Sequence, residues 1–277
     1  MKWVNDLSEI SRCVTARMKP GVFTNNFLTP DEYRAQIDMG ALYMHEWGGG
    51  LLFLQKREGR HLLTFYVNDL NVLPDVELPP DTVTEIPQKS GTREASPIVS
   101  YWAQSGLTVI FERIRLARSA EPVGVSSGAA IAQDNDFDSV YALLRDCFDL
   151  RTGCLPTERE LREDIQKGHI LRGQDGGGVL RVAERSGAME IRQLAVREDK
   201  RGRGVGHALV QDFIGRFGDR KCVTWVREDN AAALRVYTAA GFAADGFKST
   251  VMVRAVGVAV PSDPCSETRP ITESAGR

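Results

Sequence analysis

The stretch KRGRGVGHAL, residues 200–209, combines two features of a loop that binds an anion. Three glycines occupy alternate positions, and Arg201 and Arg203 stand among them. Glycine has no Cβ, so an oxygen can approach the backbone N–H groups closely and the bend can use positive φ values. An aliphatic run follows, which predicts a helix whose N-terminus points at the same place. The chemistry that these residues predict is phosphate binding.

The spacing of the glycines excludes two familiar phosphate loops. No Lys followed by Ser or Thr ends the run, as a nucleoside-triphosphate loop requires. The glycines read G-x-G-x-G, whereas the dinucleotide fingerprint requires G-x-G-x-x-G. Taken alone, the stretch is also compatible with a surface turn that carries solvated arginines.

The flanking sequence predicts the elements that would position this loop. Leu209, Phe213 and Phe217 recur at helical spacing behind it, and Gly218 is a suitable end for that helix. A strand, CVTWV, should follow, then a helix capped by Asn230 and a last strand near 247–254. Ahead of the loop, the pattern predicts helices over 138–148 and 157–167 and strands near 127–132, 168–172, 179–185 and 189–197.

Two segments together, LAVREDKRGRGVGHALV and DNAAALRVYTAAGF, resemble the GNAT superfamily of N-acetyltransferases. That family binds the pyrophosphate of acetyl-coenzyme A with Arg or Gln, two residues, Gly, one residue and then Gly or Ala. Arg201, Gly204 and Gly206 match those positions. The motif pair covers about residues 189–242, and the match weakens toward the start of that half.

The resemblance implies acetyl-coenzyme A as cosubstrate. No metal is expected, because the histidines and cysteines lack the spacing of metal ligands. Backbone groups of the loop would hold the pyrophosphate, and the strand before it would pair with the pantetheine arm and polarise the acetyl carbonyl through an N–H group. The residues assigned to the cofactor are Leu194, Ala195, Val196, Arg201, Gly202, Arg203, Gly204, Val205, Gly206 and Asn230.

Acetyl transfer to an amine also needs an acid for the departing thiolate and a base for the amine. Tyr237 matches the position where many members of the family keep the acid, and Glu190 matches the offset at which some place a catalytic glutamate. Strand alternation puts Glu190 on the side of Leu194, but a bulge, which the family commonly has, would reverse this. The alternatives are a packing role for Tyr237 and a solvent-facing charge, or an ion pair with Arg192, for Glu190. His207 is expected to be solvated or to face the phosphates.

The two halves of the chain resemble each other. WGGGLLFLQKREGRHLLTFYVND from Trp47 aligns with DGGGVLRVAERSGAMEIRQLAVRED from Asp175 if the later copy has one extra residue in its second strand. Both predict a hairpin. SYWAQSGLTVIFERIRLAR and RVYTAAGFAADGFKSTVMVR then repeat a short helix, a glycine and a long strand. We therefore predict a fold of class α/β (α+β) with two tandem GNAT-like domains, each a mixed, mostly antiparallel twisted sheet flanked by helices.

The expected domains are a degenerate GNAT-like domain over 1–120, a catalytic domain over 121–260 and a flexible tail over 261–277. The first copy continues as NVLPDVELPPDTVTEIPQKSGTREASP, with prolines where a helix should start and no glycine loop. This segment predicts that the first half binds no cofactor. The first half is expected to form one side of the acceptor site or to stabilise the second half. The tail and the stretch SAEPVGVSSG at the boundary lack the apolar residues of a packed element.

Composition indicates an ordinary globular protein with 35 basic and 37 acidic side chains. This balance argues against nucleic acid as a partner, and no apolar run is long enough for a membrane span. Five scattered cysteines without a CxxC pair predict a reducing, cytoplasmic location.

The function predicted is acetyl-coenzyme A dependent N-acetyl transfer to a primary amine by direct attack. The alternative is a non-catalytic module that senses acyl-coenzyme A. A small molecule, a protein N-terminus and a lysine remain open as the acceptor, and a homodimer is also left open.

Overall fold

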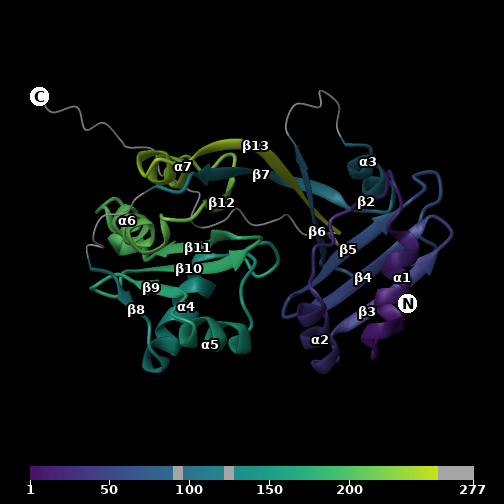
Figure 1. Ribbon diagram of the computed structural model, residues 1–277, viewed down its shortest axis with the longest axis horizontal. Coiled ribbons are helices and arrows are strands. Elements are labelled where there is room, and N and C mark those ends of the chain that lie inside the picture. The colour runs from purple at the N-terminus through teal and green to yellow at the C-terminus, as the bar shows by residue number, and fades with distance from the viewer. Residues whose placement is uncertain (90–95, 122–127, 255–277) are drawn as a thin grey trace, which may run out of the picture. The chain divides into compact units, whose positions relative to one another are not determined.

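The computed structural model describes residues 1–89, 96–121 and 128–254, and their contacts divide the chain into two compact units (Figure 1). Unit 1 contains Met1–Ile114, Leu150–Thr152 and the last strand from Gly246, whereas unit 2 contains Arg115–Asp149 and Gly153–Asp245. The expected tail, most of the expected linker and the first residue of the strand expected near 127–132 lie outside the described residues. The limits of the two domains stay a prediction.

The sheet of unit 1 runs in the order β1-β3-β4-β5-β6-β13, with β2 paired to β5. The strands are β1 (Lys2–Trp3), β2 (Phe23–Thr24), β3 (Leu42–Trp47), β4 (Gly50–Arg57), β5 (Arg60–Val67), β6 (Thr82–Lys89) and β13 (Ala243–Val253). Strand β7 (Thr108–Arg118) begins in unit 1 and ends in unit 2. All pairs from β3 to β5 are antiparallel, and β5 and β6 are parallel. The last strand of the described chain belongs to this sheet, because β13 pairs with β6 from Phe247 to Val253.

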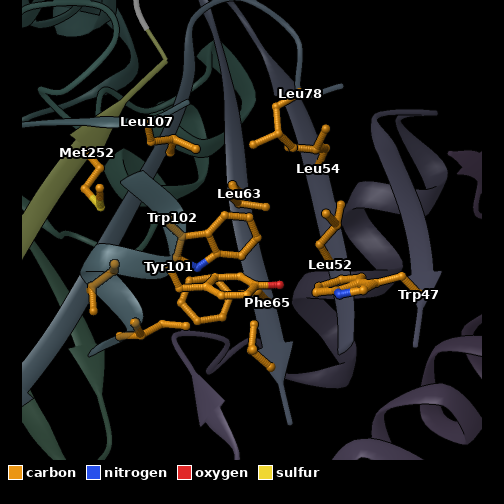
Figure 2. Close-up of a cluster of buried hydrophobic side chains, with 13 residues drawn as sticks. Trp47, Leu52, Leu54, Leu63, Phe65, Leu78, Tyr101, Trp102, Leu107 and Met252 are labelled. Atoms are coloured by element: carbon orange, nitrogen blue, oxygen red, sulfur yellow. The ribbon is translucent and has the colours of Figure 1, made fainter. Parts of the chain in front are cut away.

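Helices cover both faces of this sheet, and β4 is therefore buried on both sides. Leu51 and Phe53 pack with residues of α1 (Leu7–Arg17) and α2 (Pro30–Asp38). Leu52 and Leu54 point the other way, into a cluster that includes Trp102 of α3 (Pro97–Gln104) (Figure 2). Alternate side chains of a strand point to opposite faces, so a continuous apolar run such as GLLFL is typical of a strand covered on both sides.

The sheet of unit 2 runs in the order β12-β11-β10-β9-β8. Its strands are β8 (Ala130–Ile131), β9 (Ile170–Arg172), β10 (Gly178–Arg185), β11 (Ala188–Val196) and β12 (Cys222–Arg227). The helices are α4 (Phe137–Cys147), α5 (Glu158–Gln166), α6 (Val205–Phe217) and α7 (Ala231–Ala239), with short 3-10 turns η1 (Asp134–Asp136) and η2 (Glu198–Lys200). Helices α4 and α5 lie on one face and α6 on the other (Figure 1). The predicted elements and the mixed, mostly antiparallel fold class are confirmed.

The repeat predicted from the sequence is present in the local structure. Both hairpin turns use a glycine with positive φ, Gly59 at 66° and Gly187 at 75°. The Asn68 N–H donates to Gly49 O (2.8 Å), and at the corresponding place the Arg197 N–H donates to Gly177 O (2.9 Å).

The repeat also extends to elements that the sequence alignment did not reach. Helix α2 begins with a capping box formed by Thr29 and Glu32, and α5 begins with the same box formed by Thr157 and Glu160. Among the described residues, no helix is both long and apolar enough to cross a membrane.

Candidate functional site

The strands β11 and β12 pair for three residues only and then part. Met189–Ile191 are in parallel register with Cys222–Thr224. At the last of these pairs the Thr224 hydroxyl donates to the Ile191 carbonyl oxygen at 3.2 Å. The remainder of β11, toward Val196, therefore has one edge that is not paired with β12.

A bulge in β11 determines which side chains face which helices. The register against β10 shifts between Arg181, which pairs with Gln193, and Val182, which pairs with Ile191, so Arg192 is the extra residue. This is the single residue by which the second hairpin is longer than the first. Bulges reverse the alternation of side chains along a strand.

The bulge separates Glu190 from Leu194. Glu190 pairs with Ala183, whereas Leu194 pairs with Leu180, and residues 180 and 183 lie on opposite faces of β10. Glu190 is thus on the face covered by α4 and α5, and Leu194 is on the face of α6. In a regular strand Glu190 and Leu194 would share a face, but the bulge puts them on opposite faces.

The backbone of β10 shows where the polar groups of β11 point. Gly178 O accepts from Gly173 N–H (2.9 Å), and Val182 N–H donates to His169 O (2.9 Å). Even-numbered residues of this stretch of β10 therefore turn their backbone groups toward β9. Val179 and Arg181 turn their backbone groups toward β11.

Leu194 and Val196 consequently direct their backbone groups toward the open edge of β11. Their neighbours Gln193 and Ala195 pair with the residues of β10 that face β11, and Ala195 is fully buried. Leu194 N–H, Leu194 C=O and Val196 N–H therefore point to the edge that β12 does not cover. Val196 O accepts from Arg201 Nε at 3.1 Å. The edge can therefore pair with an extended ligand that carries amide groups.

The glycine loop connects this strand to α6. Gly202 has a φ of 73° and Gly204, which caps the helix, has a φ of 83°. Residues other than Gly rarely adopt such positive φ angles, so the bend requires glycine at both positions. A Cβ on Gly206 would stand 3.5 Å from Val196 and 3.7 Å from Leu194, so the loop packs directly over the end of β11.

The N-terminus of α6 presents a row of unsatisfied donors. The first backbone bond of the helix runs from Ala208 N–H to Gly204 O (2.9 Å). Within the described residues, the N–H groups of 202–207 have no backbone acceptor. Arg203 and His207 are exposed beside them, as expected for His207. This arrangement is suited to an anion.

A second loop supports the first, and its role was not predicted. Lys200 Nζ lies 2.8 Å from Asp175 Oδ2. A Cβ on Gly178 would lie 2.8 Å from Val205 and 2.9 Å from Leu209, so only glycine lets α6 approach β10 this closely. The GGG run at 176–178 is the sequence signal for this contact, because glycine at the start of a strand often marks the close approach of another element.

Tyr237 is buried on the α6 side of the sheet. Burial raises the pKa of its hydroxyl to about 12, and a hydrogen bond with the Thr224 side chain partly offsets this rise. Its ring packs edge-on against Phe242. Since Thr224 also bonds Ile191, Tyr237 lies next to the point where β11 and β12 part.

Asn230 caps α7, as predicted. Its Oδ1 accepts from Ala233 N–H at 3.0 Å. The Nδ2 amide has no hydrogen-bond partner among the described residues, so Asn230 can donate to a ligand while the cap stays in place.

Glu190 is buried in an ion pair. Its Oε1 lies 2.9 Å from Arg192 Nη1, and its side chain is 8% exposed. This pairing is the alternative that the sequence left open. The structure does not bring Glu190 and Tyr237 together, because they lie on opposite faces of the sheet.

A buried polar network on the α4 and α5 side was missed by the sequence reasoning. Arg181 Nε donates to Asp164 of α5 (2.6 Å), and its Nη1 donates to Gln193 Oε1 (3.0 Å). Gln193 Nε2 donates in turn to the carbonyl oxygens of Gly153 (3.1 Å) and Cys154 (2.8 Å). The signal was an Arg and a Gln placed in two otherwise apolar strands. Across the described chain, no three His, Cys, Asp or Glu side chains are grouped so that they could hold a metal ion.

Comparison with known proteins agrees with this geometry. Residues 137–242 match the model of the acetyltransferase (GNAT) family. A GCN5-related N-acetyltransferase from Sphaerobacter thermophilus is 14% identical, with a TM-score of 0.53, over 91% of this chain and 92% of that one. A GNAT-family acetyltransferase from Colwellia psychrerythraea is 12% identical, with a TM-score of 0.54, over 91% of this chain and 98% of that one. At these identities the likeness shows the fold. No curated protein matches the sequence. Over residues 137–242 the chain is therefore similar to GNAT acetyltransferases in both sequence and fold.

Proposed function

We propose that the protein is an acetyl-coenzyme A dependent N-acetyltransferase that acts on a primary amine. The observation that carries the proposal is the unpaired edge of β11 at Leu194 and Val196, which leads directly into the row of unsatisfied N–H groups at the start of α6. An extended arm with amide groups and a diphosphate at one end fits both features. Acetyl-coenzyme A has this chemistry and supplies an acetyl thioester.

Each predicted cofactor residue has a role in this proposal. Leu194 and Val196 bond the pantetheine arm, while the buried Ala195 keeps the strand in register with β10. Gly202, Arg203, Gly204, Val205 and Gly206 surround the pyrophosphate, and Asn230 donates its Nδ2 amide to the ligand. Arg201 fixes the loop on Val196 O.

The acceptor amine attacks the thioester carbon, and the carbon–sulfur bond breaks as the new amide bond forms. Leu194 N–H stabilises the negative charge that develops on the thioester oxygen. Tyr237 gives its proton to the departing sulfur. Because its pKa is near 12, the phenol is protonated throughout the physiological range, and its contribution comes from position and not from acidity.

Glu190 was predicted as the base that takes the proton from the amine. Its burial in an ion pair, on the face opposite to Leu194, supports the structural alternative instead. We propose that Glu190 stabilises the bulge at Arg192 and that the amine enters the site neutral. The proton that the nitrogen loses as the amide forms then goes to water, and Tyr237 regains its proton from water.

Isothermal titration with acetyl-coenzyme A tests the binding step. Wild-type protein should bind, and Gly204→Glu should not. The variant would place a carboxylate at the anion site, and a residue with a Cβ is strained at the positive φ of this position. Gly187→Glu is a matched control, since Gly187 also has positive φ and open space around it but lies in a hairpin turn. Absence of binding by the wild-type protein, or equal binding by both variants, would refute the proposal.

Release of free thiol with a panel of amines tests the chemistry. Turnover with any primary amine supports catalysis and identifies the acceptor class. Tight binding without thiol release from any amine, together with indifference to Tyr237→Phe, would instead support the sensor module.

A further inference from the structure

Strands β5 and β6 of unit 1 part after a short parallel pairing, as β11 and β12 do in unit 2. We call the space beyond the last paired residues of such strands an opening. Strands β5 and β6 pair in parallel only at His61 with Thr82 and at Leu62 with Val83. At the next position a threonine hydroxyl links the two strands, as in unit 2: Thr84 Oγ1 donates to Leu63 O at 2.9 Å. By the alignment of the two hairpins, this bond corresponds to that of Thr224 with Ile191.

Beyond this point the chain fills the opening with its own residues. Strand β2 pairs with the end of β5, with Phe23 opposite Val67 and Thr24 opposite Tyr66. The Thr24 hydroxyl donates to Phe65 O at 2.7 Å. In the alignment, Phe65 corresponds to Leu194, because Arg192 is the extra residue of the second copy.

The side chain of Asn25 completes the filling. Its Oδ1 accepts from Phe65 N–H at 2.9 Å, and its Nδ2 lies within bonding distance of Leu63 O (3.2 Å). The same Nδ2 reaches β6, at Thr84 Oγ1 (2.9 Å) and Glu85 O (3.0 Å). One primary amide thus bridges the two strands, and it occupies the edge N–H group that corresponds to Leu194 N–H.

The side chain that corresponds to the acid is also replaced. The second pair of repeated segments aligns Trp102 with Tyr237. Trp102 is fully buried and lies against the Phe65 ring, with centroids 5.0 Å apart, inside the apolar cluster of unit 1 (Figure 2). An indole has no acidic hydroxyl to give to a thiolate.

We propose that Phe23–Asn26 is a built-in occupant of the β5–β6 opening, in which the amide of Asn25 stands where the arm of an acyl-coenzyme A would stand in unit 2. The chain therefore binds one acyl-coenzyme A and not two. This inference rests on the function proposed for unit 2. A ligand entering unit 1 would have to displace a paired strand and replace every hydrogen bond of Asn25, since unsatisfied buried backbone groups are costly.

Amide hydrogen exchange, followed for the peptides that contain β5 and β11 with and without acetyl-coenzyme A, compares the two openings in one molecule. In the free protein we expect the Phe65 amide to exchange at least about tenfold more slowly than those of Leu194 and Val196. Acetyl-coenzyme A should protect Leu194 and Val196 and leave Phe65 unchanged, and titration should give one site per chain. Protection of Phe65 by the ligand, or two sites per chain, would overturn the inference.

Failure of the proposed function would look different. If acetyl-coenzyme A protects neither opening and produces no heat, the function of unit 2 is refuted, and slow exchange at Phe65 in the free protein still supports the built-in occupant. Fast exchange at Phe65, equal to that at Leu194, overturns the occupant whatever the ligand does.

Asn25→Ala tests the amide itself. It should accelerate exchange at Phe65 by about tenfold or more, because the N–H loses its acceptor. Asn71→Ala is the control, since Asn71 bonds only to Asp69 in its own turn among the described residues. Equal exchange in the two variants would contradict the role of Asn25. Should Asn25→Ala fail to fold, the wild-type comparison of Phe65 with Leu194 decides.

Discussion

The hydroxyl of Thr224 donates to the carbonyl oxygen of Ile191, 3.2 Å away, at the last rung before β11 and β12 separate. The same threonine bonds the buried Tyr237. One side chain therefore connects the point of separation with the predicted acid. A mutation at Thr224 should disturb both.

Thr224→Val preserves the shape of the side chain and removes both hydrogen bonds. We expect the free energy of unfolding to fall by about 1 to 2 kcal/mol and the rate of thiol release to fall by about tenfold, because Tyr237 loses the partner that orients it. Urea denaturation and steady-state kinetics measure the two effects. Thr84→Val is the matched control in unit 1 and should lower stability similarly without changing turnover. Equal loss of turnover in both variants would contradict a special role for Thr224.

The main features of unit 2 were predictable because they depend on local residue types. The glycines at 202–206, the helical spacing behind them and the cap at Asn230 each require particular backbone conformations that few residues adopt. The alignment of the two hairpins also indicated one extra residue, and that residue is the bulge at Arg192.

Other features depend on contacts between distant segments and left little trace in the sequence. The face of Glu190 depends on where the extra residue falls in the register with β10, which the alignment alone did not determine. Strand β2 is two residues long, too short for a periodic pattern, and Asn25 is recognisable only by its partners on β5 and β6. The pairing of β13 with β6 joins residues far apart in the chain. Such pairings follow from burial and long-range register and not from local preference.

Tyr237→Phe should separate chemistry from binding. Removing the hydroxyl should lower kcat by about 10² to 10⁴, the usual contribution of a positioned acid, and leave the Kd for acetyl-coenzyme A within about twofold. Titration calorimetry and thiol release on the same samples check this split. A variant with unchanged kcat, or one that loses binding and turnover together, would show that Tyr237 is a packing residue.

The same variant should alter the stability of the protein at high pH. The pKa of Tyr237 is raised from 10 in the unfolded chain to about 12 in the fold, so folding favours the neutral phenol. That contribution is fully present below pH 10 and is lost as the pH rises through 12. It amounts to about 3 kcal/mol at most. Between pH 10 and 12 the wild type should therefore lose stability relative to Tyr237→Phe in denaturation curves, whereas a difference that does not change with pH would contradict burial of the hydroxyl.

Glu190→Gln decides between the base and the ion pair. We expect kcat to stay within about threefold of wild type, its pH profile to be unchanged, and the free energy of unfolding to fall by about 1 to 2 kcal/mol, because Arg192 loses its buried partner. Arg192→Gln should produce a similar loss of stability, since it breaks the same pair from the other side. If Glu190 is the base, only Glu190→Gln should lower kcat by about 10² or more. Kinetics across pH 6 to 9 for both variants distinguish these outcomes, because an ion pair predicts that the two substitutions behave alike.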